Sequence, residues 1–238
     1  MITVPGCPKG HPGALKGVNV AILDFIPPLL QGARVTAELA AASSMLGGLL
    51  AFVFGIARLS EQWAVRVLAI VYVEVFRGTS LLVQLFWIFF ALPLLGLHLP
   101  AWTAGVLALT LNIGAYGAEV VRGAIQAVSK EQYEAAAALN FTKRHTLWRI
   151  LLPQAIVEMM PPLGNLAVQN LKSTALVSLI TLNDLTFQAQ NLRNLTQQSL
   201  EVYTLTLFMY FALALAIAGI HRWLELRVSR WVHLGGGR

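Results

Sequence analysis

Residues 129–154, SKEQYEAAAALNFTKRHTLWRILLPQ, form a polar interval that breaks an otherwise apolar chain. Its first half favours a short helix, because the opening serine offers an N-cap and acidic residues in the first turn complement the helix dipole. Ala135 to Ala138 supplies strong helix formers. Asn140 is the best non-glycine candidate for a left-handed turn. Thr142 would cap a second helix and Pro153 would end it. The interval therefore predicts two short helices set at an angle, suited to another protein's groove.

The composition on either side of this interval indicates a membrane protein. The chain has 238 residues, of which 57% are hydrophobic and only 12% are charged. A soluble domain carries about 25% charged residues, so this chain lacks the charge to cover a water-facing surface. Each membrane span needs roughly 20 apolar residues, and the length allows several. We therefore expect an all-α, polytopic membrane protein.

Five apolar stretches are predicted to span the bilayer. The second is interrupted by Arg77 to Ser80, a break that membrane depth tolerates only inside protein or beside a cavity. The fourth carries a double-proline break at Pro161 and Pro162. In the first, Gly47, Ala51 and Gly55 form either a close-packing stripe or merely the usual small-residue content of such helices. The spans are roughly Gln31–Ala57, Val67–Leu95, Ala101–Val128, Ala155–Ile180 and Val202–Leu224.

Basic residues predict the orientation of the spans. Cytoplasmic segments carry an excess of Lys and Arg, and an odd number of spans puts the termini on opposite sides. With the C-terminus inside, ten basic residues lie inside and four outside. The prediction is an outer segment 1–30, a membrane domain 31–224 with residues 129–154 in the cytoplasm, and a basic inner tail 225–238. The ten are Arg58, Arg66, Lys130, Lys143, Arg144, Arg149, Arg222, Arg227, Arg230 and Arg238, and the four are Lys9, Lys16, Arg34 and Arg193.

Several other functions are not supported by the sequence. The net charge of +6 follows from the orientation bias, and no basic stripe with interleaved aromatic residues indicates nucleic acid. A single cysteine, Cys7, allows no internal disulfide. Lys172-Ser173 looks like the end of a phosphate-binding loop, but Leu166 and Leu171 replace the required glycines. We find no metal-ligand cluster and no catalytic motif, so no cofactor, metal or enzymatic activity is expected.

The polar interval resembles the EAA loop of ABC-importer permeases. Glu134-Ala135-Ala136, then Asn140 where that family has glycine, then an Ile-Leu-Leu-Pro ending at Pro153 match its pattern. Five further motifs lie in the same order as in the polar amino acid uptake subfamily, which includes histidine- and glutamine-type permeases. They are residues 72–84, YVEVFRGTSLLVQ; residues 115–125 with AY, E and RGAI; residues 152–155, LPQA; and PPLGN at 161–165 followed by KSTAL at 172–176.

The resemblance implies a fold, partners and site residues. The fold would be a type I ABC-importer transmembrane domain in the bacterial inner membrane. Its partners would be cytoplasmic ABC ATPase subunits, a second permease of the same or a sister chain, and an extracytoplasmic solute-binding protein. The coupling residues would be Glu134, Ala135, Ala136, Asn140 and Pro153. Departures at Ser80 and at residues 173–175 leave the substrate open between a polar amino acid and a zwitterionic compatible solute such as ectoine.

Charged and polar residues within the spans have two interpretations. Glu74 with Arg77, and Glu119 with Arg122, are three apart and can form structural ion pairs on one helix face. Charges at membrane depth also mark transport pathways. The residues expected to approach the substrate are Glu74, Gln84, Asn165 and Gln169. A different class of function, a membrane enzyme or assembly factor without an ATPase partner, is the alternative to the permease.

Overall fold

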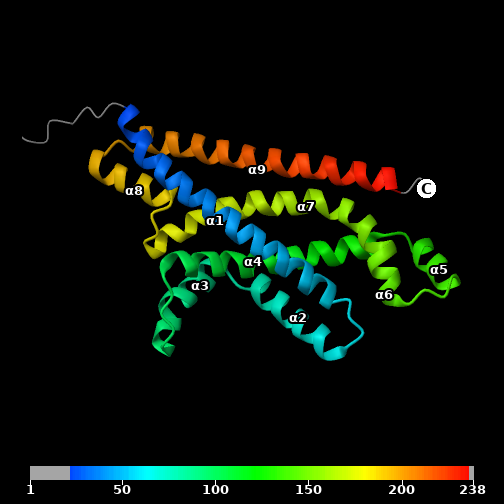
Figure 1. Cartoon of the computed structure of the whole chain (residues 1–238). Helices are drawn as coiled ribbons and strands as arrows, with labels where there is room; N and C mark the ends of the chain where they lie inside the picture. Colours follow the sequence, from blue (N-terminus) through cyan, green and yellow to red (C-terminus); the bar gives the residue numbers. More distant parts are fainter. Residues whose placement is uncertain (1–21, 236–238) are drawn as a thin grey trace, which may run out of the picture.

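The computed structural model describes residues 22–235, and the side chains of residues 24–229. Within that part of the chain every regular element is a helix, as the composition predicts. Figure 1 shows long helices running side by side, with shorter ones gathered at two ends. The elements are α1 (Ile22–Ala57), α2 (Trp63–Gly78), α3 (Leu81–Phe86), η1 (Trp87–Ala91), η2 (Leu92–Leu95), α4 (Ala101–Ala127), α5 (Lys130–Ala138), α6 (Lys143–His145), η3 (Thr146–Leu151), α7 (Leu152–Ser173), η4 (Thr174–Ile180), α8 (Leu185–Thr196) and α9 (Ser199–Gly235).

The most extensive helix pair is α1 with α4, and glycine permits its close approach. A Cβ added at Gly55 would lie 2.7 Å from the Cβ of Val121 and 2.9 Å from the carbonyl oxygen of Ala118. On α4, a Cβ at Gly117 would lie 2.6 Å from the Cβ of Ala51. Small residues at such contacts let membrane helices pack backbone to backbone. The small-residue stripe Gly47, Ala51 and Gly55 is therefore a packing surface, which supports the first of the two interpretations given above.

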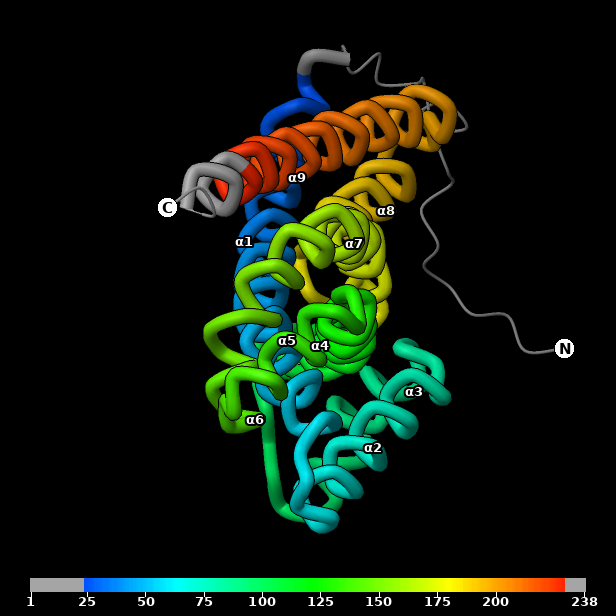
Figure 2. Tube along the Cα trace, turned by 90° about the vertical axis from the view of Figure 1, so that its right-hand side faces the viewer, coloured from blue at the N-terminus to red at the C-terminus, as the bar shows by residue number. Residues whose placement is uncertain are grey.

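The predicted break in the second span is present. The axes of the helices on either side of Thr79 and Ser80 differ by 103°, and the two segments splay away from the long helices in Figure 2. Gln84 compensates for the lost helical hydrogen bonds, because its Nε2 donates to the carbonyl of Phe76 at 2.9 Å and to the hydroxyl of Thr79 at 2.7 Å. Backbone groups at the break are thus paired by Gln84, while Arg77 to Ser80 themselves remain exposed in the single chain.

The fourth predicted span differs from expectation at both prolines. α7 continues through Pro161 and Pro162, because each proline removes only one backbone donor while the rest of the helix packs on α4 and α9. The helix changes instead at Thr174, where the 3-10 helix η4 begins. The prediction of a double-proline break is therefore wrong.

The ends of the first and last spans also differ from the predicted boundaries. α1 begins at Ile22, so Pro27 and Pro28 lie inside the helix, and α9 continues to Gly235 through most of the predicted tail. Residues 1–21 and 236–238 of the predicted terminal segments lie outside the described residues.

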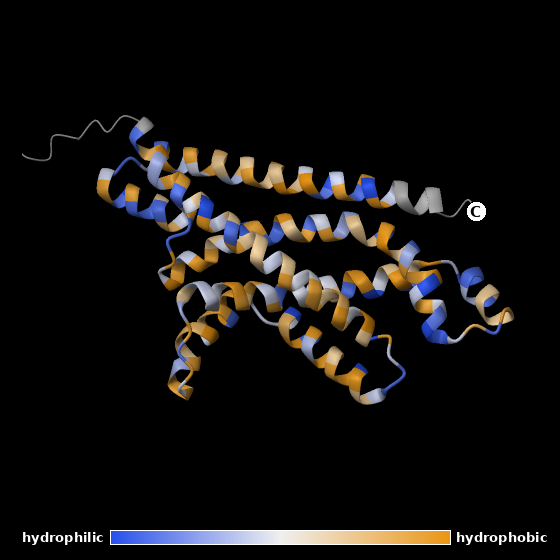
Figure 3. Cartoon of the chain, viewed as in Figure 1, coloured by the Kyte–Doolittle hydropathy of each residue, from blue (hydrophilic) through white to orange (hydrophobic). Residues whose placement is uncertain are grey.

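Three described helices, α1, α4 and α9, are long and apolar enough to cross a membrane, and the bent α2–α3 pair provides a fourth candidate. The fourth predicted span, α7 with η4, does not reach the same apolarity, which its Glu158, Lys172 and amide side chains explain. Figure 3 shows the apolar colouring of the long helices and the hydrophilic colouring of α5 and α6.

At the end opposite α5 and α6, α8 is held against α1 (Figure 1). The backbone N–H of Leu185 donates to the hydroxyl of Thr36 at 3.0 Å. Asp184 caps α8 by accepting from the N–H groups of Phe187 and Thr186 at 3.0 and 3.3 Å. Its side chain is fully buried, and this burial raises the pKa of Asp184 to about 6, although the hydrogen bonds oppose the shift.

Candidate functional site

The site begins with α5, which stands clear of the long helices. Tyr133 ties it to the bundle by donating its hydroxyl hydrogen to the carbonyl of Ile125 on α4 at 3.1 Å. Ala136 faces inward and is 2% exposed, whereas Glu134 and Ala135 are exposed. The helix therefore has one face against the molecule and a carboxylate on the face that is free for a partner.

Asn140 makes the predicted left-handed turn, with a φ of 56°. The turn is closed by two backbone hydrogen bonds, from Phe141 to the carbonyl of Ala136 and from Asn140 to that of Ala137, both at 3.0 Å. This pair of bonds is the Schellman motif, in which glycine is the usual residue and asparagine a tolerated one. The prediction of a left-handed turn at Asn140 is confirmed.

The second short helix starts as predicted but does not stop. Thr142 caps it by accepting from the N–H of His145 at 3.3 Å. Pro153 was expected to end it, yet α6, η3 and α7 form one continuous helical path through this proline. The preceding turn, Thr146 to Leu151, has the wider π-helical geometry, and Pro153 falls in the first turn of α7, where a missing N–H costs little. The prediction that Pro153 ends the helix is wrong for this reason.

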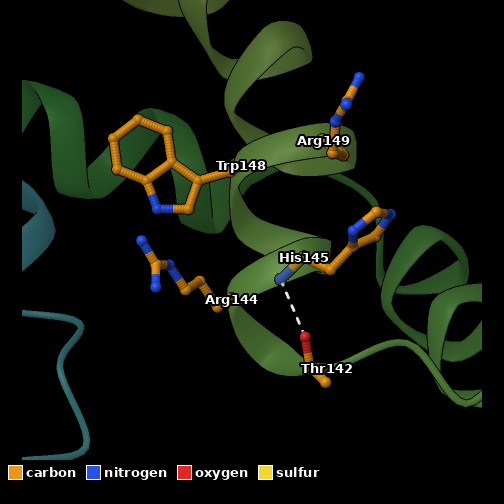
Figure 4. A pocket seen from close by; sticks show the side chains of 5 residues that line it. All are labelled: Thr142, Arg144, His145, Trp148 and Arg149. Atoms are coloured by element: carbon orange, nitrogen blue, oxygen red, sulfur yellow. Dashed lines mark hydrogen bonds between the residues drawn. The ribbon is translucent and has the colours of Figure 1, made fainter.

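A groove of about 520 Å³ lies along this helix, lined by Thr142, Arg144, His145, Trp148 and Arg149. Figure 4 shows Arg144 and Trp148 on one side of the helix and His145 and Arg149 on the other. Each pair is separated by four residues, which places its members one turn apart on the same face. Trp148 is 53% exposed, a large apolar ring presented to solvent on the same side of the helix as the guanidinium of Arg144. This combination of exposed aromatic and arginine side chains is typical of protein interfaces.

A second group of charges, the inner charge cluster, joins α1, α2 and α4. It consists of Arg58, Glu74, Arg77, Glu119 and Arg122. Glu119 is its centre, because it pairs with Arg58, lies 2.8 Å from Nη2 of Arg122 and lies 3.9 Å from Nη1 of Arg77.

The pairing expected between Glu74 and Arg77 is absent from the contacts of the described residues. Glu74 lies 3.8 Å from Arg58 instead, and Arg77 is directed to Glu119 and to the ring of Tyr116. Arg58 follows α1 directly and reaches both carboxylates, so it competes successfully for Glu74. Sequence reasoning used Arg58 only to establish orientation. A signal was present, since three arginines and two glutamates close to the ends of apolar stretches require partners across helices.

The residues expected along the substrate path are not gathered into one place. Glu74 is on α2 with an exposed side chain, whereas Gln84 on α3 is 8% exposed. The amide nitrogen of Gln84 is committed to the α2–α3 break, and its amide oxygen lies 3.4 Å from Nδ2 of Asn112. Gln84 therefore has a structural contact set, which leaves little of its amide for a solute.

Asn165 and Gln169 lie on one exposed face of α7, four residues apart. Their neighbour Asn170 points the other way and is 4% exposed. Its Nδ2 donates to the hydroxyls of Ser43 and Ser44 at 2.7 and 3.0 Å, which fastens α7 to α1. The amide-bearing part of α7 thus has a structural face and an open polar face. Among the described residues no cluster of metal-ligating side chains is present.

A family comparison agrees with this arrangement. The family described as the binding-protein-dependent transport system inner membrane component matches residues 43–230, which include the exposed loop, the inner charge cluster and α7.

Individual relatives extend the match to most of the chain. A probable amino-acid ABC transporter permease protein, y4tF, of Sinorhizobium fredii is 56% identical over 87% of this chain and 90% of its own length. The glutamine transport system permease protein GlnP of Escherichia coli is 36% identical, covering 88% and 96%. A solved amino acid ABC transporter with histidines superposes with a TM-score of 0.81 at 35% identity, covering 87% and 96%.

The fold extends further than the sequence similarity. The MetNI methionine ABC transporter, in an inward-facing conformation, gives a TM-score of 0.65 at 17% identity, which supports the type I fold alone. Nothing in these comparisons favours the alternative of a membrane enzyme or assembly factor. The chain belongs to the family of binding-protein-dependent transport system inner membrane components, the permease subunits of ABC importers.

Proposed function

We propose that this permease moves a polar amino acid, or a similar zwitterionic solute, into the cytoplasm while separate ATPase subunits hydrolyse ATP. The observation that carries the proposal is the exposed loop at one end of the molecule. There α5 presents Glu134, and α6 with η3 presents the groove around Trp148, without burying them in the permease itself. An aromatic ring left exposed on the same side as an arginine fits a docking surface.

The same arrangement supports an orientation. The end of the molecule that carries α5 and α6 also carries the end of α9, and the start of α1 and α8 lie at the other end (Figure 1). Basic side chains gather at the α5–α6 end, among them Lys143, Arg144 and Arg149. The bias of basic residues toward the cytoplasm supports the proposal of an outer N-terminus and an inner C-terminus.

Two further partners are proposed, a second permease subunit and an extracytoplasmic binding protein. The three or four apolar helices found within residues 22–235 are few to enclose a path, so a second permease of the same or a sister chain would complete it. The open polar face of α7 around Asn165 and Gln169 supports this view, since such a face is costly against lipid. An extracytoplasmic binding protein would deliver the solute, and the family description itself names dependence on such a protein.

The substrate class rests on the relatives and on the uncharged amides of α7. Similar permeases are named for the transport of glutamine, cystine and arginine. Glu74, Asn165 and Gln169 remain candidates for contact with a zwitterion, with Gln84 the weakest because of its structural hydrogen bonds. An ectoine-like solute stays within the proposal.

The proposed docking role is tested at Glu134. We expect Glu134→Lys to abolish co-purification of the ATPase subunits in mild detergent, because reversal of an exposed interfacial charge leaves two like charges facing each other. The matched control is Glu131→Lys, one turn earlier on α5 and also exposed. If Glu134→Lys left recruitment and solute uptake at the unsubstituted level, the docking role would be wrong.

A further inference from the structure

The connection between α1 and α2, Arg58 to Gln62, lies between the exposed loop and the inner charge cluster. At one end, Glu61 forms an ion pair with Lys143, the first residue of α6. This pair joins two segments that are 82 residues apart in the sequence. Among the described residues, the other side-chain hydrogen bond between the loop and the bundle joins Tyr133 to Ile125, which is only eight residues away in the sequence.

Three residues before Glu61, Arg58 is buried in the inner charge cluster. Its side chain is 13% exposed, and that of its partner Glu119 is 20% exposed. Arg58 also lies 3.8 Å from Glu74 on α2. One short connection therefore touches α6 through Glu61, α4 through Glu119 and α2 through Glu74.

The Glu61–Lys143 and Arg58–Glu119 ion pairs differ in solvent exposure, and therefore in strength. Glu61 and Lys143 are 70% and 86% exposed, so their pair contributes little to folding stability. Arg58 and Glu119 are mostly removed from water, where the loss of one partner leaves an unpaired charge at considerable cost. The cluster thus holds the connection firmly on the bundle, while the exposed pair lets it follow α6.

We propose that the connection Arg58–Gln62 is a second coupling element, in which Glu61 takes up displacement of α6 and Arg58 passes it to α4 and α2. The proposal rests on the proposed function, in which α6 moves with the ATPase. The continuous path α6–η3–α7 is the first route into the bundle, and α7 passes it to α4, α9 and α1, on which it packs. The second route adds α2, which packs on α4 and α1 and has little contact with α7. Glu61 and Arg58 are positioning residues that act through the helices and touch neither solute nor nucleotide.

The test is a charge exchange in the full complex of permease, ATPase and binding protein in proteoliposomes. Uptake of radiolabelled L-glutamine, L-histidine, L-cystine or ectoine is measured together with ATP hydrolysis. We expect Glu61→Lys and Lys143→Glu each to lower solute transported per ATP about threefold, and the double exchange to restore the ratio. The matched control is Glu225→Lys, which disrupts the exposed pair of Arg222 and Glu225 at 3.0 Å on α9 and should leave the ratio unchanged.

A second measurement needs no solute. In a Cys7→Ser background, Glu61→Cys with Lys143→Cys is oxidised to a disulfide, and ATP hydrolysis by the complex is compared before and after reduction. If the connection follows α6, the locked pair keeps at least half of its ATP hydrolysis. Arrest by oxidation, or an unchanged transport ratio in both single variants, would overturn the second route. Co-purification of the ATPase with every variant keeps this outcome distinct from failure of the proposed function, which would show as no ATPase bound to the unsubstituted chain.

Discussion

The α1–α4 interface and the loop of residues 129–154 solve opposite problems. At the interface, glycines bring two helices so close that no Cβ fits at Gly55 or Gly117, and the side chains of neighbouring helices fill the remaining space. In the loop, Trp148 and Leu139 stay 53% and 66% exposed, although the opposite side of the same segment buries Leu151 against the bundle. The α1–α4 interface is fully packed within one chain, whereas the exposed face of the loop is left without a packing partner in the same chain. The contrast teaches that stability and partner binding are separately encoded, so substitutions should separate them.

The largest effect is expected at the interface. Gly55→Val should prevent accumulation of folded permease, because the new side chain meets the Cβ of Val121 and the backbone of Ala118, and neither can move away. We expect a loss of about 4 kcal/mol or more. Detergent-extracted protein is quantified by size-exclusion chromatography with fluorescence detection. Gly48→Val is the control on the same helix, since nothing lies within 4 Å of a Cβ there. Equal yields of the two variants would contradict the packing argument.

The loop should give the converse result. Trp148→Ala is expected to leave folding intact and to weaken ATPase binding by about 3 kcal/mol, roughly a hundredfold, as for a central aromatic residue of an interface. Binding is measured by microscale thermophoresis between detergent-solubilised permease and labelled ATPase. Trp63→Ala provides the control, since Trp63 is 70% exposed at the start of α2. If Trp148→Ala kept full ATPase affinity and Trp63→Ala lost it, the docking surface would lie near the start of α2 and not at the groove.

The next effect concerns Asp184, a carboxylic acid that is fully buried where α8 packs on α1. The pKa of Asp184 is raised from 3.8 to about 6, so its proton is bound more tightly in the folded chain than in the unfolded one. Protonation therefore stabilises the fold fully below about pH 4, and this contribution is lost as the pH rises through 6.

Asp184→Asn keeps an acceptor for the α8 N–H groups without the buried charge. It should raise stability by about 2 kcal/mol at pH 7.5 relative to the unsubstituted chain, and by much less at pH 4. Thermal unfolding in detergent at the two pH values measures the gap. Asp24→Asn, at an exposed position of α1, should show the same small gap at both pH values. If the stability difference between Asp184→Asn and the unsubstituted chain were the same at both pH values, burial would not be the cause of the raised pKa of Asp184.

The smallest effect concerns the turn that shapes the loop. Asn140→Val places a β-branched residue at a φ of 56°, at a cost of about 1 kcal/mol, whereas Asn140→Gly relieves the same position. ATPase affinity should fall for the valine variant and be retained or improved for the glycine variant. Identical affinities for both would mean that the shape of the turn does not matter for docking.

Local signals in the sequence predicted most of the loop. The capping role of Thr142 and the left-handed turn at Asn140 depend on residues within four positions, and both are confirmed. The continuation through Pro153 was missed, because a π-helical turn is set by packing of the following helix and has no clear sequence signature.

Long-range contacts were harder to predict for a related reason. Pairing Glu74 with Arg77 followed helix periodicity, but Arg58 enters from another helix and changes the partners of both. Gln84 was predicted to approach the solute because its partner groups were not visible in the sequence. Its amide instead binds backbone groups that are freed by the 103° bend between α2 and α3. Neither the bend angle nor the third charge can be read from residue spacing.

The unbroken helix from Lys143 to Ser173 has a mechanical consequence. The path bends between the α6–η3 segment and α7, which run in different directions in Figure 1. α7 alone, with 22 residues at a rise of 1.5 Å each, is about 33 Å long, close to the hydrocarbon thickness of a bilayer. The two arms therefore form a bent lever. A tilt of α7 by about 10° at its groove end would displace its far end by about 6 Å. Small closure strokes outside the membrane would thus be enlarged within it without any change in secondary structure, and the stiffness of the turn before Pro153 would set how much of the stroke is lost on the way.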